Sequence, residues 1–397
     1  MSNTTLVHDL IMKEGQRTLR NNSVFVNALT AQYDASYASH GAKAGSDIRI
    51  SQPQEFSVRT GKTIDVQDVE EKAVTISRSV QRGIDIKYSS AEITQDLDSF
   101  NRTKVEPAMA TLAAYIDNYC MDLAYKEIYQ AVALPATNMD RVDILNAGVK
   151  LDNGSTPRGV ESRCSLLSPQ GMADVVNDSS GLFNNASSVS QQYDDGLVKV
   201  PAMGFTFGMS QNMPSHTTGG YDANYVTNGA GVEGASQILI DTGTGTITAG
   251  DIFTVADCYS VNALTKQSTG VLQQFVATAA SAGGTVTVAT SPALISTGPY
   301  QNIDSLPGNG KAVTFLGVAS TAYPQNLHFH KGFGAIGFCD LDVPKGNVVA
   351  RRVVEDGISL RLVDFYDGKN DDSYMRFDVL FGYKTVIPRW ACRSYQP

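Results

Sequence analysis

The chain is short of paired cysteines and of long apolar runs, and each shortage excludes a class of protein. Its five cysteines are odd in number and contain no C-x-x-C pair, which argues against a disulfide framework and predicts free, buried thiols. No apolar run could span a bilayer, and Met1–Gly15 lacks the basic start and apolar core of a secretory signal. We therefore expect no membrane association and synthesis in a reducing cytoplasm. The cysteines are Cys120, Cys164, Cys258, Cys339 and Cys392.

Charge is scarce, and positive charge scarcer still. Only 18% of the 397 residues are charged, with 31 Lys and Arg against 40 Asp and Glu, for a net charge of −9. This balance excludes a basic groove that neutralises phosphates, so any contact with DNA should be weak and non-specific. The low charge fits a subunit that hides surface against neighbours. The 42% of hydrophobic residues is enough for a buried core, and the length allows about two or three domains.

Catalytic signatures are also missing or incomplete. There is no P-loop, no evident Ser-His-Asp spacing and no G-x-S-x-G around Ser168. Asp241-Thr242-Gly243 follows an apolar run and matches the aspartic-protease signature, but that chemistry needs two carboxylates and no second D-T-G occurs. A turn after a strand uses the same residues, so we interpret Asp241 as a turn residue. An aspartic-type hydrolase that uses Asp241 stays as the weaker alternative.

Two further motifs suggest a cofactor or a metal. Gly332–Gly337 fits G-x-G-x-x-G, yet the following residues are extended rather than helical, so a dinucleotide site is rejected and close strand packing is expected. His328 and His330 share one face of a predicted strand and could start a metal site. No further ligand stands close to them before Cys339 and Asp340, so we expect surface histidines. We therefore predict no catalytic, cofactor-binding or metal-binding residue.

The N-terminal residues predict a short amphipathic helix over 6–20. Leu6, Leu10, Ile11 and Leu19 recur at helical spacing among charged residues. Two interpretations stay open, an arm that packs on a neighbouring subunit and an ordinary helix that covers its own domain.

Residues 47–88 predict a long two-stranded hairpin. Strand character appears over 47–51 and again from Ala73, with Gly61-Lys62 as a turn candidate between them. A lone hairpin is marginal in water, and its tip offers little apolar content, so we expect it to reach over a neighbour. The charged side chains expected to make contacts between subunits are Lys62, Asp65, Asp68, Glu70, Glu71 and Lys72.

The strongest local signal is a long helix over 98–133. Its aliphatic residues follow a helical period, Pro107 falls in the first turn, and Pro135 ends it. Residues 162–215 then predict mixed helix and strand, including a helix opened by Ser168-Pro169.

Composition changes sharply near residue 225. From there to about residue 328, short β-prone runs and Gly-rich turns alternate with almost no charge, which predicts a small β-barrel or sandwich inserted in a loop of a host domain. Strand patterns with the earlier composition return over 329–397, so the predicted fold class is α+β with an inserted all-β domain. We expect the excised segment 225–328 to fold by itself and its two ends to lie close together.

This order of elements resembles the coat proteins of tailed double-stranded DNA phages with the Hong-Kong-phage capsid fold. Within them it is similar to the short-tailed Salmonella-phage type, which carries an inserted β-barrel domain. Ser89–Asn118 resembles the start of that family's spine helix, Gly196–Pro214 its axial domain, and Arg376–Gly382 a late peripheral strand. Gly250–Thr254 is similar to part of the insert.

The resemblance implies a major capsid protein, present in the virion and assembled in the bacterial cytoplasm. Implied partners are copies of itself in hexamers and pentamers, a scaffolding protein, a portal protein and packaged DNA held non-specifically. A nonviral compartment shell of the same fold stays as an alternative. The implied regions are an arm at 1–46, an extended hairpin at 47–88, a peripheral domain with the spine helix at 89–160, an axial domain at 161–224, the insert at 225–328 and return strands at 329–397.

Overall fold

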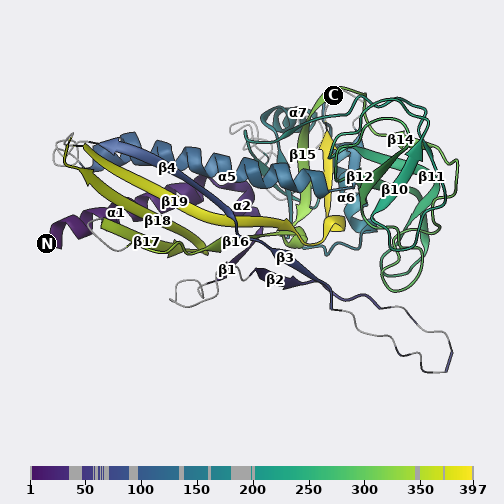
Figure 1. Cartoon of the computed structure of the whole chain (residues 1–397), viewed down its shortest axis with the longest axis horizontal. Coiled ribbons are helices and arrows are strands. Elements are labelled where there is room, and N and C mark those ends of the chain that lie inside the picture. The colour runs from purple at the N-terminus through teal and green to yellow at the C-terminus, as the bar shows by residue number, and fades with distance from the viewer. Residues whose placement is uncertain are drawn as a thin grey trace. The chain divides into compact units, whose positions relative to one another are not determined.

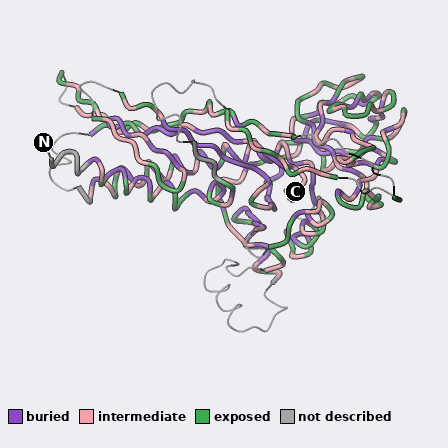
Figure 2. The backbone as a smooth tube through the Cα atoms, turned by 90° about the horizontal axis from the view of Figure 1, so that it is seen from below, coloured by how far each residue is buried: buried purple, intermediate pink, exposed green. Residues whose placement is uncertain are grey.

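A computed structural model of the chain shows two compact units (Figure 1). The structure describes residues 2–34, 47–56, 58, 61–62, 64, 66, 71–88, 97–133, 138–159, 162–179, 198, 202–344, 349–369 and 372–395. The first unit contains Met1–Ile50, Ala73–Cys120 and Gly334–Lys384, and the second contains Ser51–Lys72, Met121–Phe333 and Thr385–Pro397. Buried segments run through both units (Figure 2).

The first unit is built on a six-stranded sheet of order β1-β16-β19-β18-β17, with β4 also paired to β19. β16 pairs with β1 in parallel, and β19 pairs with β18 and β4 in antiparallel. The strands are β1 Thr30–Asp34, β4 Val80–Tyr88, β16 Gly334–Cys339, β17 Val349–Glu355, β18 Ile358–Asp367 and β19 Asp372–Thr385.

Helices α1 (Ser2–Asn22) and α2 (Val24–Ala28) belong to this unit. α1 contacts β17 and β18, Ile11 and Met12 are fully buried, and the Gln16 side chain donates to the Ile358 carbonyl at 2.9 Å. Of the two interpretations of the N-terminal helix, the structure therefore shows packing on the helix's own chain.

The long helix is confirmed over most of its predicted range. It begins with α4 (Leu97–Phe100), continues through a wide π-helical turn (Asn101–Val105), and runs as α5 (Glu106–Glu127) from the first unit into the second. The wide turn precedes Pro107, whose ring would otherwise meet the carbonyl four residues earlier. The predicted end at residue 133 is wrong, because the helix ends at Glu127 and residues Ala131–Ala133 form strand β5.

The second unit contains a sheet of order β5-β20-β15-β6-β7, with β8 also paired to β15. Helices α6 (Arg141–Asn153) and α7 (Pro169–Ser179) pack here, and the Ser168 hydroxyl accepts the Gly171 N–H at 3.1 Å, as expected for the cap of α7. The strands are β5 Ala131–Ala133, β6 Arg163–Leu167, β7 Thr206–Met209, β8 Ser215–Thr217, β15 Ala322–His330 and β20 Ala391–Tyr395.

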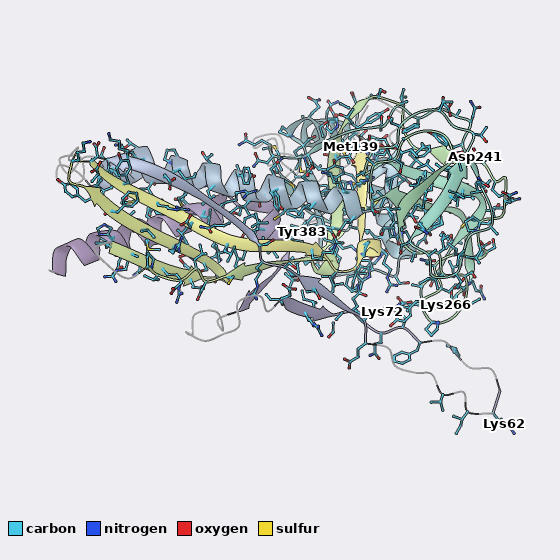
Figure 3. All side chains as sticks on the ribbon, in the orientation of Figure 1. Lys62, Lys72, Met139, Asp241, Lys266 and Tyr383 are labelled. Atoms are coloured by element: carbon cyan, nitrogen blue, oxygen red, sulfur yellow. The ribbon has the colours of Figure 1, made fainter. Side chains whose placement is uncertain are left out.

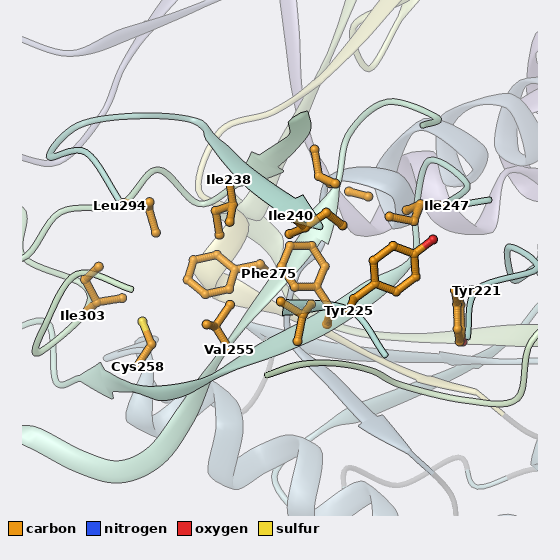
Figure 4. Packing of buried hydrophobic residues seen from close by; sticks show 14 residues of the cluster. Tyr221, Tyr225, Ile238, Ile240, Ile247, Val255, Cys258, Phe275, Leu294 and Ile303 are labelled. Atoms are coloured by element: carbon orange, nitrogen blue, oxygen red, sulfur yellow. The ribbon is translucent and has the colours of Figure 1, made fainter. Parts of the chain in front are cut away.

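A second sheet in this unit has the order β14-β11-β12-β13-β10-β9. A bridge between Val226 and Ala312 joins its two edges and closes it into a small barrel. The barrel interior is apolar and includes Phe275, Ile240 and Tyr225 (Figure 4). The strands are β9 Val226–Thr227, β10 Gln237–Asp241, β11 Ile252–Val261, β12 Ser268–Ala277, β13 Val286–Ser291 and β14 Val313–Phe315.

The limits of the barrel differ from the predicted 225–328. Thr218 N–H donates to the Thr321 carbonyl at 3.0 Å, and Thr321 N–H donates to the Thr218 hydroxyl at 3.0 Å, so the chain enters and leaves at one place. Tyr221 lies in the barrel core, whereas β15 belongs to the other sheet of the unit. The part of the chain between these two threonines is residues 219–320.

The hairpin is also shorter than the predicted 47–88. Strand β2 (Ile48–Ser51) pairs with β3 (Ala73–Ile76) in a separate two-stranded sheet, whereas β4 pairs with β19. Gly61, at the predicted turn, has a φ of 92°, a backbone conformation that glycine adopts readily.

Candidate assembly site at the base of the hairpin

Glu55 anchors the second-unit part of the hairpin. Its carboxylate accepts a hydrogen bond from Lys266 Nζ at 3.0 Å and another from the Arg389 guanidinium. The Glu55 side chain is only 13% exposed, and that of Lys266 only 15%. An ion pair between a buried carboxylate and two cations contributes more than an exposed ion pair. Removing the carboxylate would leave both cations without their partner. Glu55 therefore joins the hairpin to the insert and to the C-terminal segment.

Lys266 is positioned by its own turn. Its φ of 55° is left-handed, and its N–H donates to the Asn262 carbonyl at 2.9 Å. The Asn262 side chain accepts from Leu264 N–H at 2.9 Å and Thr265 N–H at 3.1 Å, which is the turn chemistry that asparagine favours. The ammonium is thus presented by a hydrogen-bonded turn.

The returning strand of the hairpin has its own contacts. Lys72 Nζ lies 3.5 Å from the centre of the Tyr300 ring in the insert, a cation–π arrangement. Gln52 N–H donates to the Lys72 carbonyl at 2.8 Å, and the Gln52 side chain donates to the Val386 carbonyl. In Figure 3, Lys72 lies at the base of the hairpin and Lys62 at its far end.

A buried polar cluster lies where the chain enters the insert. Asp251, 2% exposed, accepts from Thr248 N–H at 2.7 Å and Gly219 N–H at 3.1 Å, and its other oxygen lies 2.8 Å from His216 Nε2. The guanidinium of Arg393 donates to the Gly250 carbonyl, and burial lowers the pKa of Arg393 to about 10. These contacts satisfy buried polar groups and hold the entry to the insert against its Thr248–Asp251 turn.

The side chains exposed at the hairpin tip differ in part from those expected from the sequence. Lys62 and Glu71 are exposed, as predicted, but Lys72 packs on Tyr300 instead of standing free. Asp65, Asp68 and Glu70 lie outside the described residues. The expectation of little apolar content was wrong, because large hydrophobic side chains of the hairpin are exposed, among them Val58 at 92%, Ile64 at 79% and Val66 at 83%.

Asp241 is a turn residue in the structure. Its carboxylate accepts from Thr242 N–H at 2.6 Å and from the Thr285 hydroxyl at 2.9 Å. Thr242 has a left-handed φ of 75°, and a Cβ at Gly243 would overlap the Tyr225 ring at 2.2 Å. All three residues of the D-T-G sequence therefore help to form the turn that follows strand β10.

The expectation that His328 lies on the surface was wrong. The ring is fully buried between the hydroxyls of Ser165, at 3.0 Å, and Ser394, at 2.9 Å, and burial lowers the pKa of His328 to about 4, which keeps the ring neutral. His330 is half-buried and accepts the Gly332 N–H at 3.0 Å. Among the described residues, no group of three or more His, Cys, Asp or Glu could hold a metal.

The glycines of Gly332–Gly337 allow close packing, as expected. A Cβ at Gly334 would lie 2.7 Å from the Tyr383 hydroxyl, and one at Gly337 would lie 3.2 Å from Ile48. β16 follows where a dinucleotide site would need a helix. The five cysteines are free and buried, as predicted. Among the described residues, no helix is both long and apolar enough to cross a membrane.

The chain is related in sequence to viral coat proteins. A family model described as "P22 coat protein - gene protein 5" matches residues 1–392, and the chain belongs to this family. It is similar to the major capsid protein of Acyrthosiphon pisum secondary endosymbiont phage 1, with 25% identity over 248 residues. That match covers 56% of this chain and 58% of the relative, so only part of the relative's length is spanned.

Two solved structures of phage proteins also match parts or most of the chain. A chain of Mycobacterium phage Che8 matches with a TM-score of 0.46 and 11% identity, over 94% of this chain and 90% of that chain. The CUS-3 coat protein I-domain matches with a TM-score of 0.20 and 26% identity, over 24% of this chain and 96% of that chain.

Proposed function

We propose that this chain is the major capsid protein of a tailed phage and that its copies assemble into the icosahedral head around the DNA genome. The observation that carries the proposal is the family match over residues 1–392, which includes the hairpin, the long helix and the insert. The joint at Glu55 supports it, because a hairpin that contacts a neighbour must be held in a defined direction by its own subunit.

The partners we propose are copies of the chain in hexamers and pentamers, a scaffolding protein during assembly and a portal protein at one vertex. Packaged DNA is held non-specifically, in keeping with the net charge of −9. Assembly takes place in the cytoplasm of the bacterial host, the shell rearranges as it matures, and the chain catalyses no reaction.

Contacts between subunits involve the hairpin tip. We assign the polar part of these contacts to Lys62, Asp65, Asp68, Glu70, Glu71 and Lys72, and the exposed Ile64 and Val66 supply an apolar part. Apolar side chains exposed to this extent gain most when a second surface covers them.

Electron microscopy and analytical ultracentrifugation of the purified chain, with and without a scaffolding protein, test the function. Closed particles or capsomers are expected. A chain that stays strictly monomeric across a range of salt and scaffold concentrations would contradict the proposal.

A further inference from the structure

A cavity of about 390 Å³ lies within the second unit and is lined by residues of helix α6 and of strand β12 of the insert. Its volume is in the range of small-molecule sites. The hairpin joint accounts for one of its charged lining residues, since Arg389 is paired with Glu55. The other charged lining residue, Lys150, takes no part in the hairpin joint.

The polar lining of this cavity has no negative charge. The chain as a whole carries 40 acidic residues, yet the described residues that line the cavity include no Asp and no Glu. Side-chain amides dominate instead. They are Gln130, Asn146, Asn153, Gln273, Gln274, Gln301 and Asn302. Amides and an ammonium together favour an anionic guest over a cationic one.

Lys150 has an incomplete set of partners. Its ammonium lies 3.3 Å from Gln274 Oε1, an oxygen that already accepts the Ala131 N–H at 2.9 Å. An ammonium carries three donors, and within the described residues no carboxylate pairs with this one. Burial lowers the pKa of Lys150, which shows that its charge is poorly solvated and would gain from an anion.

The lining also has an apolar part, beside the hydroxyls of Ser260 and Thr269. Val149, Val261, Val271 and Leu272 line the cavity together with the Tyr129 ring. A single unpaired ammonium beside such a surface suits a monoanion with a hydrocarbon body better than a phosphate, whose double charge would need more cations.

We propose that this cavity binds a small organic carboxylate with an apolar body, held at its carboxylate by Lys150 and the neighbouring amides. The proposal does not depend on the capsid function, because it concerns one subunit and is tested by binding to the full-length chain.

Isothermal titration calorimetry with sodium hexanoate tests the site, and hexanamide serves as the neutral probe of the same shape. Hexanoate is expected to bind one site per chain, at least about tenfold more tightly than hexanamide. Lys150→Met, which keeps the aliphatic stem, should weaken hexanoate binding by about tenfold, and Lys150→Arg should retain most of it. The exposed Lys369→Met serves as the matched control and should bind as the parent does.

A second measurement avoids any dependence on the folding of the Met variant. In the parent chain with ¹³C-labelled lysine, hexanoate should shift the Cε signal that is lost in Lys150→Arg, and hexanamide should not. No binding of hexanoate, equal binding of the two probes, or unchanged binding by a folded Lys150→Met variant would overturn the proposal.

Discussion

At the scale of single residues, Glu55 offers the sharpest test of the hairpin joint. Glu55→Gln keeps the shape but removes the charge that Lys266 and Arg389 share, and should lower the free energy of unfolding by roughly 1–3 kcal/mol. Limited proteolysis should also cut the hairpin faster, because its base is less firmly held.

The matched control for Glu55→Gln is an exposed ion pair of the insert. Lys311 Nζ lies 2.6 Å from Asp257, whose side chain is 64% exposed, so Asp257→Asn should change stability by less than about 0.5 kcal/mol. Equal effects of the two substitutions in urea unfolding would show that the Glu55 joint adds nothing beyond a surface pair.

Asp117 should make the stability of the subunit depend on pH. Its carboxylate accepts the N–H groups of Val24, Phe25 and Val26, yet burial raises the pKa of Asp117 from 3.8 to about 6. A raised folded pKa gives a contribution that is fully present below about pH 4 and is lost as pH rises through 6. The shift corresponds to roughly 3 kcal/mol.

Urea unfolding of the parent and of Asp117→Asn at pH 4 and pH 7 measures this contribution. Between these values the parent should lose roughly 2 kcal/mol more than the variant, which cannot titrate at this position. Parallel pH profiles would mean that the three backbone hydrogen bonds fully offset the burial of the charge.

At the scale of elements, the insert should fold alone, and its stability should depend on the residues at which the fragment begins and ends. Tyr221 stacks on Phe315 with ring centres 4.4 Å apart, so a fragment of residues 219–320 keeps this pair and omits β15. It should melt cooperatively and at a higher temperature than residues 225–328, which lose Tyr221 and carry most of a strand from another sheet. A lower melting temperature for 219–320, by circular dichroism, would refute these limits.

Patterns within short stretches of sequence predicted the elements that are formed by residues close together in the chain. The aliphatic period over 98–133 identified the long helix, and the loss of charge after residue 225 identified the barrel. The joint at Glu55 left no such signal, because its partners lie 211 and 334 positions away in sequence. The burial of His328 was missed for the same reason, since Ser165 and Ser394 come from distant strands.

At the scale of the whole molecule, the hairpin tip should support assembly by two separable means. Glu70→Lys with Glu71→Lys should weaken assembly at low salt, and the effect should fade at about 1 M salt, where charges are screened within about 3 Å. Ile64→Ser with Val66→Ser should weaken it at every salt concentration, because apolar contact is not screened.

Light scattering of assembly reactions across a salt series separates the two effects. Val232→Ser, at an exposed valine of the insert, is the control for loss of a surface hydrophobic side chain. If both tip variants show the salt response of the parent, the hairpin tip takes no part in contacts between subunits.

The paired threonines at the neck of the insert have a consequence for the order of folding. Thr218 and Thr321 are 103 positions apart, and joining such distant points costs roughly 3 kcal/mol more chain entropy than closing a tight turn. Once the barrel has formed, that entropy is already lost, and β8 meets β15 as if the two strands were joined by a short loop. A slowly forming barrel would therefore delay the host sheet, and substitutions in the barrel core should slow the folding of strands they never touch.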